Sequence, residues 1–369
     1  MGRCPRAATV YNATVLISRF LTCALLCALP AAAQQYKIAV IGLVHSHVWG
    51  HLKTMVAGQE ATLVGVAEPN AELVAEAKKA GVADNLIFTD YKQMLDQVKP
   101  DIIWAFVENN RHVEIAEACA PRKINIIFEK PLAANHQQAL RIQKLAQQNG
   151  VQVMSNYQMA WWPANYVAKA KADSGDLGQI YRLHGIVGHG GPGSQGVRNK
   201  YFFEWLTDPE KNGAGALMDF GCYNALWSLW YLGRPETVYA TVNHLRPETF
   251  PKVEDNADLL LSYPKAVGIF EASWDLPKSY QDLEVFGLKN SVYMKNGSVE
   301  VGSGKKSQAL DVTPLPPAES EPIAFMVDHL RSHKPIEGLT ALDINVQVVE
   351  IIDAAKESVR TGKAVHLKR

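Results

Sequence analysis

Apolar and polar positions alternate in blocks along the first half of the chain. Short apolar runs, typical of strands buried on both faces, are separated by segments with the apolar spacing of helices. The apolar runs are KIAVIG, TLVGVA, DIIWAFV, INIIFE and VQVMSN. The helical segments between them are 46–57, 71–80, 91–98, 112–120 and 136–149. This order predicts an α/β fold that begins with a doubly wound parallel sheet, a Rossmann domain of residues 34–155.

The pattern changes after residue 155. A strand at 178–187 and a glycine-rich loop at 188–196 precede five closely spaced strand-like runs. These runs, separated by turn residues, are ETVYATVNHL, ADLLLSY, AVGIFEASW, DLEVFG and SVYMKN. Helices are predicted at 163–174, 214–232, 323–332 and 341–361. The second domain, residues 156–369, is therefore predicted to be α/β with a mostly antiparallel open sheet. We expect its C-terminal helix to pack back on the Rossmann domain.

The first 33 residues have the composition of a signal peptide. The uncharged run FLTCALLCALPAAA is 14 residues long, shorter than the roughly 18 that suggest a membrane span. It ends with Ala31 and Ala33 in the positions that a signal peptidase reads. We expect cleavage near Ala33, a periplasmic or secreted mature protein, and no stable membrane span after processing.

The composition changes this picture little. The chain has 369 residues, 47% of them hydrophobic and 20% charged, with a formal net charge of zero, which is ordinary for a globular protein. Since there is no basic excess, we expect no nucleic-acid partner. Only Cys119 and Cys222 follow the predicted leader, and their apolar surroundings indicate buried free thiols.

The turn after the first strand resembles a degenerate dinucleotide-binding loop. The usual three glycines would stand at positions 42, 44 and 47, but Val44 and His47 accompany Gly42. Val44 places a branched side chain where the backbone should approach the diphosphate. Ser46 is expected to cap the next helix and to leave its N–H groups free as an anion site. Glu68, at the end of the second strand, is expected to bond both ribose hydroxyls and to favour NAD over NADP.

Three histidines, His45, His47 and His51, crowd the same loop and helix. His47 and His51 are four residues apart and can share a helix face. No acidic or cysteine partner lies nearby in the sequence, and metal sites usually need three or four ligands. We therefore expect no metal, and assign His45 and His47 to hydrogen bonding at the mouth of the helix.

Lys130 is the first candidate for chemistry. The sequence FEKPLAAN places Glu129, Lys130 and Pro131 directly after an apolar strand. Lys130 therefore emerges at the carboxyl edge of the sheet, where open α/β sheets bind ligands. A lysine in this place can polarise a hydroxyl or a carbonyl.

Five stretches, in order along nearly the whole mature chain, resemble the Gfo/Idh/MocA family, named for glucose–fructose oxidoreductase and inositol dehydrogenase. The stretches are ENNRHVEIAEAC, FEKPLA, SGDLGQIYRLHG, GAGALMDFGCYNALWSLWYLG and ESVRTGKAVHL. The resemblance implies a Rossmann domain followed by an α/β domain whose open sheet covers the active site and often forms oligomer contacts. It also implies a homodimer or homotetramer, and cofactor contacts from Asn109, His112, Glu129 and Lys130.

The resemblance also assigns catalytic roles. Lys130 matches the catalytic lysine of the family and Asp219 the carboxylate of the second domain. Tyr223 stands where many members have histidine, as it does in the glucose–fructose oxidoreductase branch. A free tyrosine has a pKa of about 10, too high for a good base, and a nearby Lys130 ammonium would lower it. Tyr223 and Lys130 are therefore a plausible acid–base pair, with Asp219 one helical turn before Tyr223.

A further set of residues is suited to gripping a polyhydroxylated ligand. Aromatic faces fit sugar rings, and arginine fits hydroxyls or carboxylates. The candidates are His189, Arg198, Trp161, Trp162 and Trp205.

Together these features predict an exported nicotinamide-dependent oxidoreductase that acts on a sugar, cyclitol or related polyol. An exported enzyme meets little free cofactor, so we expect the cofactor to be tightly bound. Two alternatives stay open. One is an NAD-dependent glycosidase or lyase that works by transient oxidation and elimination. The other is a carbohydrate-binding relative without cofactor.

Overall fold

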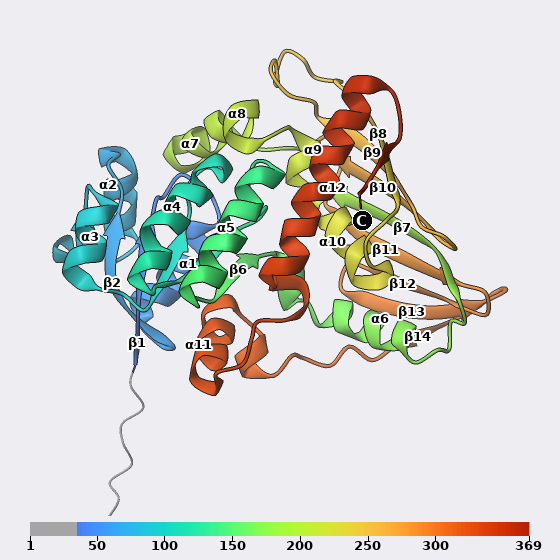
Figure 1. Cartoon of the computed structure of the whole chain (residues 1–369), viewed down its shortest axis with the longest axis horizontal. Coiled ribbons are helices and arrows are strands. Elements are labelled where there is room, and N and C mark those ends of the chain that lie inside the picture. The colour runs from blue at the N-terminus through green and yellow to red at the C-terminus, as the bar shows by residue number, and fades with distance from the viewer. Residues whose placement is uncertain (1–34, 369) are drawn as a thin grey trace, which may run out of the picture. The chain divides into compact units, whose positions relative to one another are not determined.

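The computed structural model describes residues 35–368, so the predicted signal peptide lies outside the described residues. These residues form two sheets with helices packed around and between them (Figure 1). Within residues 35–368, no helix combines the length and hydrophobicity needed to cross a membrane.

The first sheet has six strands in the order β3-β2-β1-β4-β5-β6, and all neighbouring pairs are parallel. Every residue of β4 is buried, as the continuous apolar run indicated. The strands are β1 (Tyr36–Ile41), β2 (Ala61–Ala67), β3 (Ile87–Phe88), β4 (Ile102–Ala105), β5 (Asn125–Glu129) and β6 (Val153–Asn156). The predicted doubly wound parallel sheet is confirmed.

Helices alternate with these strands. They are α1 (Val48–Ala57), α2 (Ala71–Lys79), α3 (Tyr91–Val98), α4 (His112–Cys119) and α5 (His136–Asn149). The observed bounds of α3 and α5 equal the predicted ones. Asp90 and Asn135, the residues that precede these helices, each accept a backbone N–H bond that fixes the helix start.

The second sheet has nine strands in the order β14-β13-β12-β11-β7-β10-β9-β8-β15. All pairs are antiparallel except β7 with β10, so the prediction of a mostly antiparallel sheet is confirmed. The strands are β7 (Ile180–Gly188), β8 (Thr237–Asn243), β9 (Asn256–Ser262), β10 (Val267–Ser273), β11 (Tyr280–Gly287), β12 (Ser291–Lys295), β13 (Ser298–Ser303), β14 (Lys306–Leu310) and β15 (Val365–His366).

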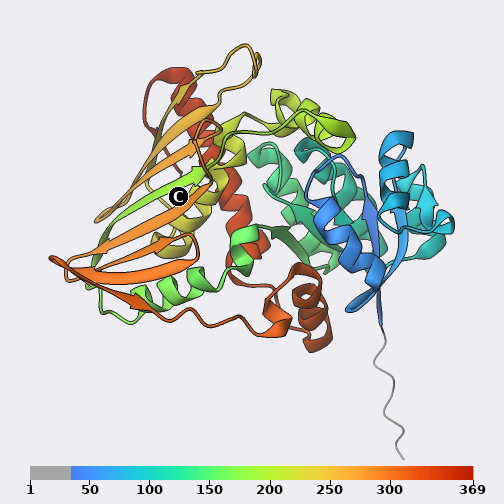
Figure 2. The ribbon, with the colours of Figure 1, turned by 180° about the vertical axis from the view of Figure 1, so that it is seen from behind.

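One face of the second sheet packs on helices and the other is exposed. Along β9, Leu259 and Leu261 are buried while Leu260 between them is exposed. Figures 1 and 2 show the helices gathered on one side of this sheet. The exposed face carries Leu260, Tyr239 and Ile269 on neighbouring strands.

The helices of the second half differ from the prediction in two places. The block predicted at 214–232 is divided into two helices, and two helices that were not predicted, α7 and α8, follow the glycine-rich loop. The helices are α6 (Pro163–Asp173), α7 (Gly196–Leu206), α8 (Pro209–Asn212), α9 (Ala216–Asp219), α10 (Gly221–Leu232), α11 (Pro322–Ser332) and α12 (Leu342–Thr361). Strands β13 and β14 were also missed, because their solvent-facing residues leave little apolar alternation.

Helix α12 joins the two sheets. On one side, Asp353 accepts a bond from the N–H of His136 (2.7 Å) at the start of α5. On the other side, the Ser358 hydroxyl accepts a bond from the N–H of Ala240 (3.0 Å) in β8. The helix thereby fixes the position of one sheet against the other (Figure 1).

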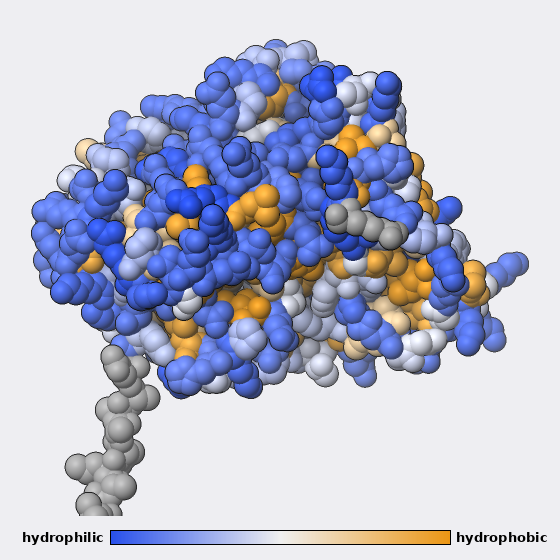
Figure 3. Space-filling view, in the orientation of Figure 1, coloured by the Kyte–Doolittle hydropathy of each residue, from blue (hydrophilic) through white to orange (hydrophobic). Residues whose placement is uncertain are grey.

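The core is free of disulfides within the described residues. Cys119 and Cys222 are both buried and free, which confirms the prediction. The face seen in Figure 3 is mostly hydrophilic, with apolar side chains in smaller patches. Buried aromatic side chains, such as Trp227 in α10, fill the space between helices and sheets.

We expect Trp227→Phe to lower the free energy of unfolding by about 2 kcal/mol or more. The Trp227 indole N–H donates to the Asn165 side-chain oxygen (2.9 Å), and the substitution leaves that buried acceptor without a partner. Urea unfolding followed by circular dichroism measures the loss. Trp230→Phe on the same helix is the matched control, because Trp230 is only partly buried. Equal losses in the two variants would contradict the prediction.

Candidate functional site

Gly42 makes the sharp turn at the end of β1. Its φ is +80°, a conformation that favours glycine. A Cβ here would lie 2.5 Å from the Val107 Cγ1 and 3.0 Å from the Phe106 oxygen. The turn therefore requires glycine for steric reasons alone.

The expected anion site at the start of α1 is not formed as predicted. Helix α1 begins at Val48, and Ser46 makes no capping bond. The N–H groups of Val48 and Gly50 bond to the carbonyls of His45 and His47, and the His45 N–H bonds to the Phe106 carbonyl (3.1 Å). The prediction that Ser46 caps the helix and frees its amides is wrong, because the tight turn uses these amides itself.

Glu68 lies directly after β2, where the sequence placed a ribose-binding carboxylate. One of its oxygens accepts the Leu43 N–H (2.7 Å) and the other the Asn70 N–H (2.8 Å). Burial raises the pKa of Glu68, although these two bonds oppose the rise. The carboxylate borders a cavity of about 330 Å³ at the ends of β1 and β2, which Gly42, Val44 and Arg111 also line. This cavity suits the adenosine half of a dinucleotide.

Lys130 and Asp219 form a buried ion pair that links the two sheets. Lys130 follows β5, and Asp219 ends α9, 89 residues later. The Lys130 ammonium contacts the Asp219 carboxylate and donates to the Asp219 backbone oxygen (3.0 Å). The other carboxylate oxygen accepts the indole N–H of Trp274 (2.8 Å). The structure therefore brings Lys130 and Asp219 together.

Both members of this pair are charged. Burial lowers the pKa of Lys130, but the Asp219 carboxylate has the opposite effect and the net direction is upward. Burial raises the pKa of Asp219, but the Lys130 ammonium outweighs it and the net direction is downward. A buried pair of this kind becomes costly when one partner is removed, by about 3–5 kcal/mol.

Tyr223 lies beside Lys130, but its electrostatics differ from the expectation. The Lys130 Nζ is 5.2 Å from the centre of the Tyr223 ring. Burial raises the pKa of Tyr223 and outweighs the lowering by Lys130, so the expected activation of the phenol as a base is wrong. Asp219 and Tyr223 also belong to two separate helices, α9 and α10, rather than to one continuous turn.

His189 also lies in this neighbourhood. Its ring contacts Phe220 edge-on, with centroids 4.9 Å apart, and its Nδ1 accepts the Gly191 N–H (3.0 Å). Burial lowers the pKa of His189, while the nearby Asp219 carboxylate raises it. Of the five substrate candidates, His189 is the one that the structure places near the ion pair.

The other four candidates bind protein groups elsewhere. The Arg198 guanidinium lies 4.4 Å above the Trp49 ring, and its Nε donates to Glu76 (3.1 Å). The indoles of Trp205 and Trp161 donate to the Val44 carbonyl (3.2 Å) and to Asn156 (2.8 Å). Trp162 precedes α6 and packs against the core of the second half.

Asn109 and His112, expected at the cofactor, are fully buried. The Asn109 amide donates to the side-chain oxygen of Asn212 (2.7 Å), at the end of α8. The His112 ring stacks on Phe128, and its Nδ1 bonds to the Leu132 carbonyl (3.1 Å). Burial lowers the pKa of His112 to about 4, so the ring is neutral at pH 7.

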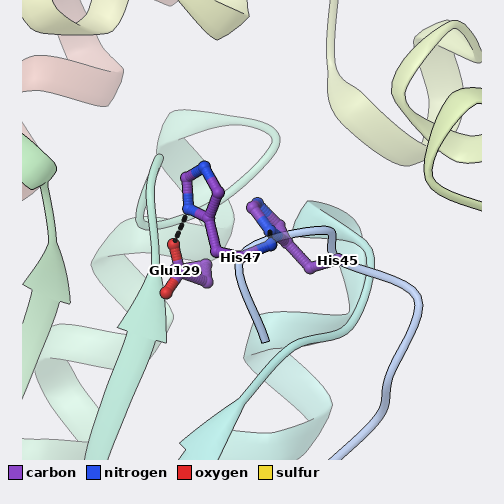
Figure 4. Close-up of side chains that lie close together, drawn as sticks. All are labelled: His45, His47 and Glu129. Carbon is purple, nitrogen blue, oxygen red and sulfur yellow. Dashed lines mark hydrogen bonds and ion pairs between the residues drawn. The ribbon is translucent and has the colours of Figure 1, made fainter. Parts of the chain in front are cut away.

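His47 has an acidic partner that the sequence analysis did not find. Its Nδ1 lies 2.8 Å from an oxygen of Glu129, which is 82 residues away in the chain (Figure 4). The other Glu129 oxygen accepts bonds from Trp104 (3.1 Å) and Asn156 (2.9 Å). The expectation that no acidic residue accompanies the histidines is wrong, because parallel strands bring the end of β5 close to the end of β1.

His45, His47 and Glu129 lie close enough together to be considered as metal ligands. One nitrogen of each histidine, Nδ1, however, already takes part in another bond. His45 Nδ1 accepts the His47 N–H (3.3 Å), and His47 Nδ1 bonds to Glu129. A metal-bound histidine normally donates its second nitrogen to an acceptor, and the His45 Nδ1 faces a donor instead. The hydrogen bonds account for this group of side chains without a metal.

Trp274 is the functional neighbour that sequence reasoning missed. It is fully buried, and it orients Asp219. Its one sequence signal is its place at the end of the predicted strand AVGIFEASW. That place does not reveal the contact, since the partner is 55 residues away.

Two family models match the chain. The model described as "Oxidoreductase family, NAD-binding Rossmann fold" matches residues 36–157. The model described as "GFO/IDH/MocA C-terminal domain" matches residues 167–293. Both halves of the chain therefore match models from one family.

Known relatives agree with this match. The chain is 24% identical to D-xylose 1-dehydrogenase (NADP(+)) 2 of Haloferax volcanii, over 87% of this chain and 99% of that protein. The structure of aldose–aldose oxidoreductase from Caulobacter crescentus with glycerol has a TM-score of 0.77 at 18% identity, over 90% of this chain and 100% of that one. Levoglucosan dehydrogenase with NADH and levoglucosan has a TM-score of 0.75 at 21% identity, over 91% and 100%. These two structures show the shared fold.

We expect His112 to make the protein less stable in mild acid. Its pKa is about 4 in the folded protein and about 6.5 in an unfolded chain, so the unfolded state binds the additional proton. Stability should therefore fall as the pH drops from about 6.5 to about 4, by about 3 kcal/mol from this group. Urea unfolding at several pH values should show a smaller loss in His112→Gln. The same pH dependence of the unfolding free energy in His112→Gln and in the wild type would contradict the prediction.

Proposed function

The chain belongs to the Gfo/Idh/MocA oxidoreductase family, and we propose that it transfers hydride between a nicotinamide cofactor and a hydroxyl-bearing carbon of a sugar, cyclitol or related polyol. The observation that carries this proposal is the buried Lys130–Asp219 pair at the carboxyl edge of the first sheet. Ligands of open α/β sheets bind at this edge. The substrate class is supported by the sugar dehydrogenases among the relatives.

We propose NAD as the cofactor, and the residues of the first βα turn support this choice. Gly42 makes the sharp turn after β1, and the cavity beside Glu68 accommodates an adenosine. The Glu68 carboxylate can accept bonds from ribose hydroxyls, and its charge repels a 2′-phosphate. The bound nicotinamide supplies the chemistry of taking or giving the hydride.

Lys130 would act on the substrate oxygen. Its ammonium, kept charged by Asp219, donates a hydrogen bond and stabilises the negative charge that develops on that oxygen. Asp219 and Trp274 fix the position of the ammonium. Such fixed donors are effective because they need no rearrangement during the reaction.

Tyr223 would act as a neutral phenol rather than as a phenolate. Burial raises its pKa, so the hydroxyl keeps its hydrogen at neutral pH. It can therefore donate a hydrogen bond or a proton to a carbonyl oxygen when the substrate is reduced.

We also propose that the cofactor is tightly held, and helix α7 supports this. The Tyr201 hydroxyl bonds to Glu72 (2.9 Å), and Arg198 bonds to Glu76, so α7 is fastened to α2. Trp205 bonds to Val44 in the dinucleotide turn. A helix fastened over this turn would have to move before a dinucleotide could leave.

The place of action and the assembly are also proposals. The pattern of residues 1–33 supports export to the periplasm or beyond the cell. The exposed sheet face, with Tyr239, Leu260 and Ile269, supports a homodimer or homotetramer.

The reaction can be tested by following nicotinamide absorbance with D-xylose and levoglucosan, after which two of the relatives above are named, and with inositol, after which a further relative is named. We expect turnover with at least one such sugar or polyol. Lys130→Met should reduce kcat about a hundredfold or more while the cofactor stays bound, because the charge on the substrate oxygen loses its donor.

Two variants complete this test. Lys130→Arg keeps a positive charge beside Asp219, so it tests whether the loss of activity comes from misfolding. It should also lose activity, because the guanidinium has a different shape from the ammonium. Lys144→Met on α5 is the matched control, because the Lys144 side chain is exposed whereas Lys130 is buried. No hydride exchange by the wild type with any polyol, using NAD+ or NADP+, would contradict the proposal.

The bonds that hold α7 to α2 give a separate prediction about the rate of cofactor release. We expect the double variant Arg198→Ala, Tyr201→Phe to release its cofactor about fivefold faster, because it loses an ion pair, a cation–π contact and a hydrogen bond. Stopped-flow measurement of nicotinamide fluorescence after dilution records the rate. Glu204→Ala, an exposed residue of the same helix, should release at the wild-type rate. Equal rates in both variants would show that α7 does not retain the cofactor.

A further inference from the structure

We propose that His47, held by Glu129, binds the diphosphate of the dinucleotide through its outward nitrogen, Nε2. This inference rests on the proposed function, since it names the contact that the degenerate turn offers in place of its missing glycines. The turn lacks those glycines, and the N–H groups of His45, His47 and Val48 are already bonded, so a side-chain donor would strengthen an anion site here.

The backbone of the turn has few donors left. In a dinucleotide fold the diphosphate is held at the first βα turn by free amides at the start of the helix. Here the N–H of His45 bonds to the Phe106 carbonyl, and the N–H of Val48 to the His45 carbonyl. The N–H of His47 bonds to His45 Nδ1. A side chain on the turn can therefore add a donor to the few amides that remain.

His47 occupies the position of the third glycine and has the required direction. Its Nδ1 meets Glu129 at the end of β5, so the ring extends from the start of α1 across to β5 (Figure 4). The His47 side chain is 21% exposed, whereas Glu129 is completely buried. The side of the ring that carries Nε2 is therefore the accessible side.

Glu129 fixes the ring and its proton. Three donors surround the carboxylate: His47 Nδ1, the Trp104 indole N–H and the Asn156 amide. Burial raises the pKa of Glu129, but the neighbouring histidines, His47 first, outweigh it and hold the pKa well below its usual range. The Glu129 carboxylate accepts the hydrogen of His47 Nδ1. Nε2 donates to an anion only when it also carries a hydrogen, so the proposed form is an imidazolium, with one N–H on Glu129 and the other directed away from it.

His45 cannot take this role. Its ring is enclosed by Phe202 and Trp205, with centroids 5.2 and 5.5 Å away. Burial, with His47 beside it, lowers the pKa of His45 well below the usual value and keeps it neutral. Its ring instead packs edge-on against the His47 ring, with the two ring centroids 4.5 Å apart.

The test compares ADP-ribose, which carries the diphosphate, with adenosine, which does not. We expect His47→Gln to weaken ADP-ribose binding about tenfold or more, since a hydrogen bond to a charged group is lost, and to leave adenosine binding unchanged. Glutamine can still donate to Glu129, which protects the fold. Titration calorimetry measures ADP-ribose, and ligand-observed magnetic resonance measures adenosine.

His51→Gln is the matched control. His51 lies one turn further along α1 and stacks on Trp104 (4.4 Å) without joining the Glu129 pair. It should bind both ligands as the wild type does. Thermal unfolding of each variant checks that the fold is kept.

The outcomes separate this inference from the proposed function. If the wild type binds neither ADP-ribose nor NADH, the proposed function fails and this inference with it. If the wild type binds ADP-ribose and His47→Gln binds it equally well, only this inference is overturned. It is also overturned if the wild type binds one equivalent of Zn²⁺, and His47→Gln abolishes that binding but leaves ADP-ribose affinity unchanged.

Discussion

The buried ion pair between Lys130 and Asp219 ties together two sheets that the chain builds separately. Each charge would be costly alone in this interior, and each is kept ionised by the other. The pair therefore favours one relative placement of β5 and α9. Because Lys130 is also the group that meets the substrate in the proposed reaction, the same contact serves the fold and the chemistry.

The dinucleotide turn shows how the site was changed without loss of the strand–turn–helix frame. Gly42 is retained because Val107 and Phe106 leave no room for a side chain. The other two glycine positions hold Val44 and His47, and several amides of the turn bond within the turn itself. The frame therefore sets where an anion can bind, while the side chains decide which groups hold it.

Much of the fold could be predicted because local patterns determine it. Runs such as DIIWAFV and the polar residues before α3 and α5 specify strands and helix starts within a few residues. Helix α7 was missed because its polar and aromatic residues contact the first half of the chain, so its sequence shows no simple apolar stripe. The Glu129–His47 bond and the Asp219–Trp274 bond join residues 82 and 55 positions apart, and no local pattern encodes them. The raised pKa of Tyr223 is likewise a result of burial, which sequence spacing cannot measure.

The single parallel pair in the second sheet, β7 with β10, determines which side chains come together at one edge of that sheet. Two parallel strands end at the same edge of a sheet, so the residues that follow them lie close together. Antiparallel neighbours end at opposite edges. Gly188 and Ser273 end level with each other, so His189 and Trp274 both emerge beside Asp219. The ends of β7 and β10 thus lie at one edge of the second sheet. Near this edge, Asp219 meets Lys130, which follows β5 of the first sheet.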